Sequence, residues 1–337
     1  AMTLELDTFL VALYTIIDDL YLAHFAELRS HCPGRRGELS DSEVLTLLIA
    51  AQWLHWSERK FLRYAHCHWR EFFPRLLSQS AFNKRARNLV GVLVHLVPLT
   101  AAALGAHLSA YHVFDGVPVP LMRRCRGDHH RLFADEASIG KGGSDRDWYY
   151  GCQVLLVVTD EGVITGFVLA PASTEGHWLA EALLCWRVNP EGRMWTPQDL
   201  PPAHRRGGSY VGPTGPIWPR DGVGTQSLVP YIGDDGFRGE AWRGHWYGDY
   251  EACVWTPQSY AGEDAKAQRR QHSSWRQVVE TVGEHLTHVF GLAFPGARSK
   301  WGLLTRVAAK LVTFNLGLML NRLYGREDFA FATLFVC

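Results

Sequence analysis

The sequence lacks three features that would place the chain in a membrane or outside the cell. No run of about 18 or more uncharged apolar residues occurs, so we expect no membrane span. The N-terminus lacks a basic stretch followed by an apolar core and a small-residue cleavage site, so we expect no secretory signal. The seven cysteines are odd in number and irregular in spacing. They therefore make no disulfide framework and favour a reducing cytoplasm.

Net charge is also absent, because 34 Lys and Arg residues balance 34 Asp and Glu residues. The distribution is nevertheless uneven. Residues 59–90 carry eight basic residues and one Glu, and residues 266–322 carry nine basic residues and two Glu. Between them, residues 115–182 carry ten acidic and six basic residues. The neutral total therefore does not exclude a polyanionic partner, although ordinary surface charge explains the same counts.

Residues 1–105 show the spacing of helices. In "LSDSEVLTLLIAAQWLH", Ser40 and Glu43 form a capping box before an apolar run. The segment "SQSAFNKRARNLVGVLVHLV" predicts one helix with a basic start and an apolar remainder. A helix that begins this way could enter a DNA groove, or the basic residues could form a solvated face. The candidate DNA contacts on it are Asn83, Lys84, Arg85 and Arg87.

Strand patterns begin near residue 110. "YHVFDGVPVP" predicts a short apolar strand that ends in a turn, and "WYYGCQVLLVVTD" with "GVITGFVLAPAS" predicts an antiparallel hairpin. The hairpin is followed by a helix and then by an irregular Gly/Pro-rich insertion at about 187–226. Two short strands and two long helices complete the chain. The chain is long enough for one large domain or two ordinary ones. This order predicts a mixed sheet flanked by helices, preceded by an all-helical N-terminal domain.

Two of the predicted strands end in carboxylates followed by glycine. Asp115 precedes Gly116, and Asp234 and Asp235 precede Gly236. Carboxylates at the ends of neighbouring strands would repel each other, and a divalent cation such as Mg²⁺ would relieve that repulsion. Alternatively, Asp115 only caps a turn.

A third carboxylate, Glu280, lies off the apolar stripe of the predicted helix at 273–290. It could complete a metal site. It could equally form a surface ion pair with Arg276, four residues earlier on the same face. Spacing alone does not decide between these two roles.

Five ordered motifs between residues 80 and 323 resemble the DDE transposases of bacterial insertion sequences. "VFDGVPVP" resembles the first-Asp strand of that family, and the segment from "RCRGDHHRLF" through "WYYG" to "APAS" resembles the family's next segment. "GDDGF" resembles the second-Asp motif, in which Gly236 and Phe237 favour Asp234 over Asp235. "RQVVETV" carries the Arg-x-x-x-Glu of the third-acid helix, and "ARSKWGLLTRVAAKLVTFNLGLMLNRL" resembles the C-terminal helix.

The resemblance implies an RNase H-like catalytic domain over residues 106–337, behind a helical DNA-binding and dimerisation domain over residues 1–105. It implies that Asp115, Asp234 and Glu280 are catalytic residues and hold two Mg²⁺ ions, with Mn²⁺ as a substitute. The implied reaction cleaves the ends of the element's own DNA and joins them to target DNA by phosphoryl transfer. An RNase H-like nuclease without strand transfer and a catalytically silent DNA-binding derivative are the alternatives.

The implied partners are double-stranded DNA, as terminal inverted repeats and as target, and a second copy of the chain in a homodimer. The implied location is the bacterial cytoplasm, with association to the nucleoid when DNA is bound. Arg276 is expected to contact the scissile-strand phosphate, and Arg298 and Lys300 the DNA backbone. Ser273 and Thr287 stand where some relatives have a Tyr and a Lys that handle the DNA end. That role is expected to pass to neighbours such as His272, His285 or His288.

Overall fold

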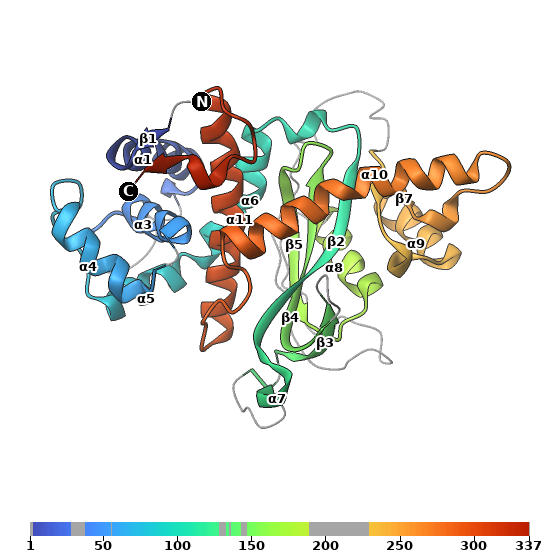
Figure 1. The fold of residues 1–337 in the computed structure, drawn as a ribbon, viewed down its shortest axis with the longest axis horizontal. Coiled ribbons are helices and arrows are strands. Elements are labelled where there is room, and N and C mark those ends of the chain that lie inside the picture. The colour runs from blue at the N-terminus through green and yellow to red at the C-terminus, as the bar shows by residue number, and fades with distance from the viewer. Residues whose placement is uncertain are drawn as a thin grey trace.

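The structure is a computed structural model that describes residues 3–27, 38–54, 56–127, 133–134, 136–142, 147–188 and 229–336. Figure 1 shows N-terminal helices on one side, a curved sheet on the other and a long helix between them. The N-terminal helices are α1 (Leu6–His24), α3 (Asp41–Leu54), α4 (Glu58–His68), α5 (Gln79–Asn88) and α6 (Val90–Ala103). The predicted insertion at 187–226 lies outside the described residues beyond position 188.

The predicted helical region is confirmed, with two corrections. It is not all-helical, because strand β1 (Leu4–Glu5) pairs with strand β8 (Phe335–Val336). The capping box at the start of α3 is present, because the Glu43 N–H donates to Ser40 Oγ at 3.1 Å and the Ser40 N–H donates to the Glu43 carboxylate at 2.5 Å. The single helix expected after Ser78 is wrong. The chain bends by 58° at Leu89, which separates the basic helix α5 from the apolar helix α6.

A mixed sheet forms the other half of the molecule. Its strands run in the order β5-β4-β2-β6-β7, and β3 pairs with the first half of β4 on the β5 side. Strands β2, β4 and β5 are antiparallel, whereas β6 and β7 are parallel to β2. The bounds are β2 (His112–Arg123), β3 (Ser138–Gly142), β4 (Asp147–Thr159), β5 (Ile164–Pro171), β6 (Tyr231–Ile232) and β7 (Val254–Trp255).

Strand β2 corrects the expectation of a short strand that ends at Asp115. It continues through Pro118 and Pro120 and pairs with β4 as far as Arg123. Strand β6 pairs only with the first two residues of β2, so among the described residues no strand pairs with β2 on that side beyond Val113. Proline has no N–H to donate and is tolerated on such an open edge, which is why the two prolines did not end the strand.

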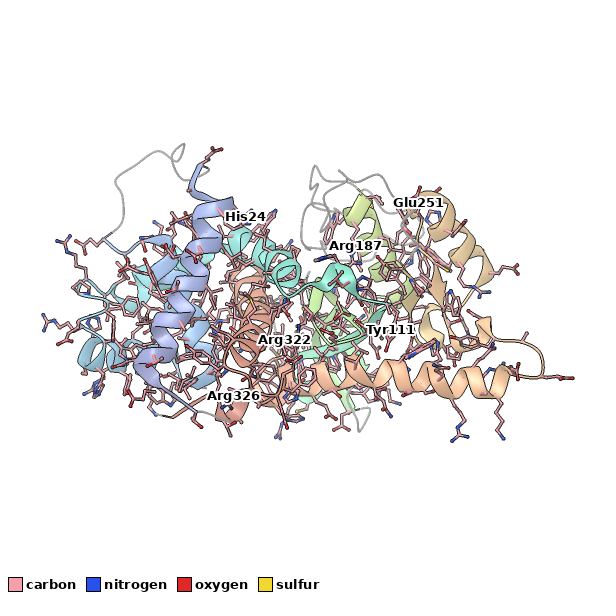
Figure 2. All side chains as sticks on the ribbon, turned by 90° about the horizontal axis from the view of Figure 1, so that it is seen from above. His24, Tyr111, Arg187, Glu251, Arg322 and Arg326 are labelled. Carbon is pink, nitrogen blue, oxygen red and sulfur yellow. The ribbon has the colours of Figure 1, made fainter. Side chains whose placement is uncertain are left out.

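Helices cover both faces of the sheet. On one face α8 (Gly176–Val188) and α9 (Glu240–Tyr250) bury Phe114 of β2, while on the other α10 (Ala265–Glu284) buries Val117. Helix α10 crosses the sheet diagonally in Figure 1. Figure 2 shows it along one side of the sheet, where the ring of Tyr111 lies 5.3 Å from that of Trp275.

Helix α11 (Lys300–Leu323) is the central helix of the molecule, packed against α3, α6 and β5. It is long and apolar enough to cross a membrane, but 89% of its most apolar window is buried inside the protein. The side-chain amide of its Asn315 bonds both backbone groups of Ile164, the first residue of β5. It accepts from the Ile164 N–H at 3.0 Å and donates to the Ile164 carbonyl at 2.8 Å. The N-terminal helices and the sheet therefore share one core through α11.

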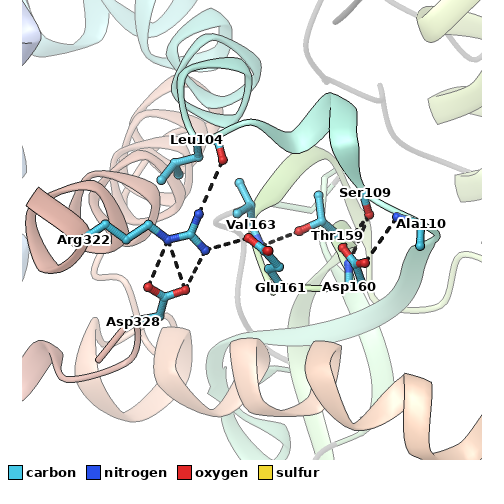
Figure 3. Close-up of polar contacts among 9 residues, drawn as sticks. All are labelled: Leu104, Ser109, Ala110, Thr159, Asp160, Glu161, Val163, Arg322 and Asp328. Carbon is cyan, nitrogen blue, oxygen red and sulfur yellow. Dashed lines mark hydrogen bonds and ion pairs between the residues drawn. The ribbon is translucent and has the colours of Figure 1, made fainter. Parts of the chain in front are cut away.

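Polar contacts fix the end of α11 to the β4–β5 turn, as Figure 3 shows. The Arg322 guanidinium donates to Asp328 at 2.6 Å and to Glu161 of the turn at 2.8 Å. Beside it, Asp160 accepts from the Ser109 hydroxyl at 2.8 Å. These contacts hold the segment that leads into β2, the strand that carries Asp115.

Candidate active site

Strands β2 and β6 bring Asp115 and Asp234 together. Their parallel register pairs Val113 with Ile232. Asp115 and Asp234 lie two residues beyond this pair, Asp115 within β2 and Asp234 at the turn that follows β6. The negative charge of Asp234 raises the pKa of Asp115, so the two carboxylates lie within electrostatic range of each other.

Asp115 points to the face of the sheet that α10 covers. One of its carboxylate oxygens accepts from an Arg276 Nη at 2.6 Å, and the other accepts from the Gly116 N–H at 2.7 Å. Its side chain is 24% exposed. Burial raises the pKa of Asp115, the guanidinium of Arg276 lowers it, and the charge of Asp234 raises it again, with a net rise. Asp115 is therefore a strand residue in a charged site and does not cap a turn.

The loop that carries Asp234 depends on glycine and phenylalanine. Asp234 Oδ1 accepts from the Gly236 N–H at 2.8 Å and caps the short turn η3 (Asp235–Phe237). A Cβ on Gly236 would lie 2.8 Å from that oxygen, so a larger residue would displace the Asp234 carboxylate from this hydrogen bond. Phe237 is buried, with its ring centroid 4.4 Å from that of Phe114. Asp235 points to solvent, which agrees with the choice of Asp234 made from the sequence.

His272 of α10 supports this loop from inside the protein. Its Nε2 donates to the Gly233 carbonyl at 2.8 Å, and its Nδ1 accepts from the Tyr260 hydroxyl at 3.1 Å. The side chain is 0% exposed, and burial lowers its pKa, so the imidazole is neutral. The expectation that His272 takes a surface role at the DNA end is therefore wrong. The residue holds the backbone next to Asp234.

Glu280 is not gathered with the two aspartates. It lies on the exposed flank of α10, one turn after Arg276, and within the described residues it forms no hydrogen bond or ion pair. The surface ion pair between Arg276 and Glu280 does not form either, because Arg276 contacts Asp115 instead. The Nε of Arg276 is buried and has no hydrogen-bond partner in the described structure. The structure thus brings two of the three predicted acids together. The third, Glu280, lies on α10 on the same face as Arg276, one turn further along the helix.

Asp115 and Asp234 are the residues here that could hold a divalent cation. Mg²⁺ in proteins is commonly held by one or two carboxylates, with water and phosphate oxygens completing its shell. Asp115 and Asp234 supply those two carboxylates, and a cation between them would relieve the repulsion that raises the pKa of Asp115. In the part of the chain that the structure describes, no group of three His, Cys, Asp or Glu side chains could hold a metal ion.

The predicted DNA contacts on α5 divide into two kinds. Arg85 donates to Asp41 at 2.5 Å and to the Leu39 carbonyl at 3.1 Å, so it ties α5 to α3. Asn83 donates to the carboxylate of Glu58 on α4. Lys84 and Arg87 are exposed and remain available to a partner.

The predicted contacts at the start of α11 are close to solvent. Arg298 is exposed, and Lys300 is half-buried with its ammonium 5.9 Å from the ring of Trp301. His288 is exposed, whereas His285 stacks on Phe329 at 5.5 Å. Of the histidines named as substitutes at the DNA end, His288 is the one that faces solvent.

A buried carboxylate on α8 was missed at the sequence level. Glu181 is 6% exposed and accepts from Trp246 Nε1 at 3.0 Å, from His245 Nε2 at 3.0 Å and from the Tyr250 hydroxyl. These three donors lie on α9, so Glu181 fixes α9 to α8 on the face of the sheet opposite α10. No local pattern in the sequence identifies it, because the donors are more than 60 residues away.

Comparison of the chain with protein-family models, with curated proteins and with solved structures found no match.

Proposed function

We propose that this protein is a DNA transposase that cleaves the ends of its own insertion sequence and joins them to target DNA by metal-dependent phosphoryl transfer. The observation that carries this proposal is the proximity of Asp115 on β2 to Asp234 in the turn after β6, beside the helix that carries Glu280. The proposal also includes an RNase H-like fold for the sheet. A three-stranded antiparallel meander extended by two strands parallel to the first supports that assignment.

The proposed metal ligands are Asp115, Asp234 and Glu280. Two Mg²⁺ ions, or Mn²⁺ in their place, would supply Lewis-acid activation of the attacking oxygen and stabilisation of the leaving oxygen. Glu280 has no internal partner among the described residues, so it is free to join the site when a cation is present.

In this proposal, basic side chains of the protein bind and orient the DNA phosphate that reacts. Arg276 neutralises Asp115 at 2.6 Å and would donate to a scissile-strand phosphate bound at the same place. His272 holds the Gly233 carbonyl and through it the Asp234 loop. The proposed backbone contacts are Lys84, Arg87, Arg298 and Lys300, whereas Arg85 serves the packing of α5. The inverted repeats would be read by the N-terminal helices of a homodimer.

The test is a strand-transfer assay with a labelled duplex that carries the element's end and a supercoiled target plasmid, in Mg²⁺ and in Mn²⁺. Wild-type protein should cut at the element boundary and form joined products. Glu280→Gln should abolish both steps, while Glu284→Gln, an exposed glutamate on the next turn of α10, should not. Cutting without joining would favour the nuclease alternative. Binding without cutting in either metal would favour the silent derivative and refute the proposal.

A further inference from the structure

A large cleft separates the N-terminal helices from the start of α11. Its volume is about 1210 Å³, larger than the roughly 300–1,000 Å³ of a small-molecule site. One wall comes from α3, α4 and α5, and the other from residues 290–310. The two segments that the sequence singled out as basic, α5 and the start of α11, therefore face the same space.

The cleft carries an excess of positive charge. Its lining holds the cationic side chains Arg87, Arg298, Arg306 and Lys310, and one acidic side chain, Glu58. Glu58 pairs with Arg306 at 2.7 Å. The other three cations have no carboxylate partner among the described residues. A surface of this kind attracts a polyanion.

Lys310 is the strongest sign of an anionic ligand. Its side chain is 8% exposed, and its ammonium donates to Gln52 Oε1 at 2.8 Å and to the Phe290 carbonyl at 2.5 Å. Both partners are uncharged, and an ammonium has a third donor. Burial, together with the nearby charge of Arg306, lowers its pKa to about 8. A buried cation is costly without a counter-ion, and an anion in the cleft would compensate it.

An aromatic ring also lines the cleft. Phe294 is 56% exposed and has a φ of 54°, a left-handed conformation that is strained for a bulky residue. Its N–H donates to the Pro120 carbonyl of β2 at 2.8 Å, which fixes the strained backbone. An exposed ring held rigidly beside cations is suited to stacking on a base next to a bound phosphate.

We propose that this cleft binds the sugar-phosphate backbone of a DNA strand, with Lys310 at its floor, Arg87 and Arg298 at its rims and Phe294 stacked on a base. The inference rests on the proposed function and names where its DNA is held. Pro120 lies five residues after Asp115 on β2, which spans roughly 17 Å at 3.3 Å per residue. That distance equals about five base steps at 3.4 Å each, so a strand stacked on Phe294 would need about five nucleotides to span to Asp115.

The test measures DNA affinity by fluorescence anisotropy, in EDTA, over a range of salt concentrations. The probe is a labelled duplex that carries the element's end, and a second probe has a frayed end. Arg87→Gln and Arg298→Gln should each raise Kd on the order of tenfold and lower the slope of log K against log salt by about one. Arg270→Gln, an exposed arginine at the far end of α10, should leave both unchanged.

Two further variants test the floor and the ring. Lys310→Met should weaken binding of both probes, provided that urea unfolding shows it to be folded. Phe294→Asn keeps a residue that tolerates the left-handed backbone and should weaken binding of the frayed probe roughly tenfold. Unchanged affinity and salt slope in both rim variants would overturn the inference, even if Lys310→Met fails to fold.

The same experiment separates this inference from the proposed function. Binding is measured without metal and repeated in Asp115→Asn, so it does not depend on cleavage. If the rim variants lose affinity but the wild type never cuts DNA, the cleft assignment stands and the transposase proposal fails. If the wild type cuts and joins DNA while the rim variants bind normally, the transposase proposal stands and the cleft assignment fails.

Discussion

The buried histidine at the start of β2 should make the stability of the protein fall at acid pH. His112 is 3% exposed, its ring stacks on Tyr231 at 5.6 Å, and its Nδ1 has no hydrogen-bond partner in the described structure. Burial, followed by the nearby charge of Arg187, lowers its pKa from 6.5 to about 3. Below pH 6.5 the unfolded chain therefore binds a proton that the folded chain does not.

The size of the effect comes from the two pKa values. The stabilisation is fully present above pH 6.5 and is lost as the pH falls toward 3, because the folded pKa is the lower one. At about 1.36 kcal/mol per pH unit, a change from pH 6.5 to pH 4.5 removes roughly 3 kcal/mol of unfolding free energy. A His112→Gln variant has no proton to gain at this position. The free energy of unfolding of His112→Gln minus that of wild type should therefore rise by that amount between pH 7.5 and pH 4.5.

Urea unfolding at both pH values, followed by the fluorescence of the 13 tryptophans, measures this difference. Any fixed cost of burying the glutamine amide cancels, because it is the same at both pH values. His66→Gln, at an exposed position on α4, is the matched control and should change stability by less than about 0.5 kcal/mol. If the difference between His112→Gln and wild type is the same at pH 7.5 and pH 4.5, the reasoning is wrong.

Three further substitutions test the loop and the charges around the acid pair. Gly233→Ala should destabilise the protein by about 1–3 kcal/mol in urea unfolding, because its Cβ would lie 2.8 Å from a buried phenylalanine ring; an unchanged midpoint would contradict this packing. Tyr260→Phe should cost about 1–3 kcal/mol by leaving the buried Nδ1 of His272 without a donor, and a cost additive with that of His272→Gln would contradict the hydrogen bond. Arg276→Met should raise the pKa of Asp115 further, measured by NMR titration of the carboxyl carbon, because it removes the cation that lowers it; a fall would refute the ion pair.

Long elements with a clear apolar period could be predicted from the sequence, and short or polar ones could not. The β4–β5 hairpin, the helical N-terminal region and α11 agree with the pattern. Helix α9 was missed because Trp246 is its one buried side chain, so the segment has no apolar stripe. The bend at Leu89 was missed because α5 and α6 together read as one continuous helical pattern.

The candidate site could be predicted where motif and strand order act together. The proximity of Asp115 and Asp234 was expected from two apolar segments that are each followed by Asp and Gly, although β2 continues beyond Asp115. The roles of His272 and Lys310 could not be predicted, because each depends on partners from distant parts of the chain. The Arg276 contact was missed for the same reason, since Asp115 is 161 residues away.

The most direct test of the account is single-turnover nicking of the element's end in Mg²⁺ by a matched pair of variants, Asp234→Asn and Asp235→Asn. The two carboxylates are adjacent in sequence, but Asp234 lies beside Asp115 and Asp235 faces solvent. We predict that Asp234→Asn abolishes nicking while Asp235→Asn stays close to the wild-type rate, with DNA binding unchanged in both. Wild-type nicking by Asp234→Asn would contradict the central claim that Asp115 and Asp234 form the metal-dependent active site.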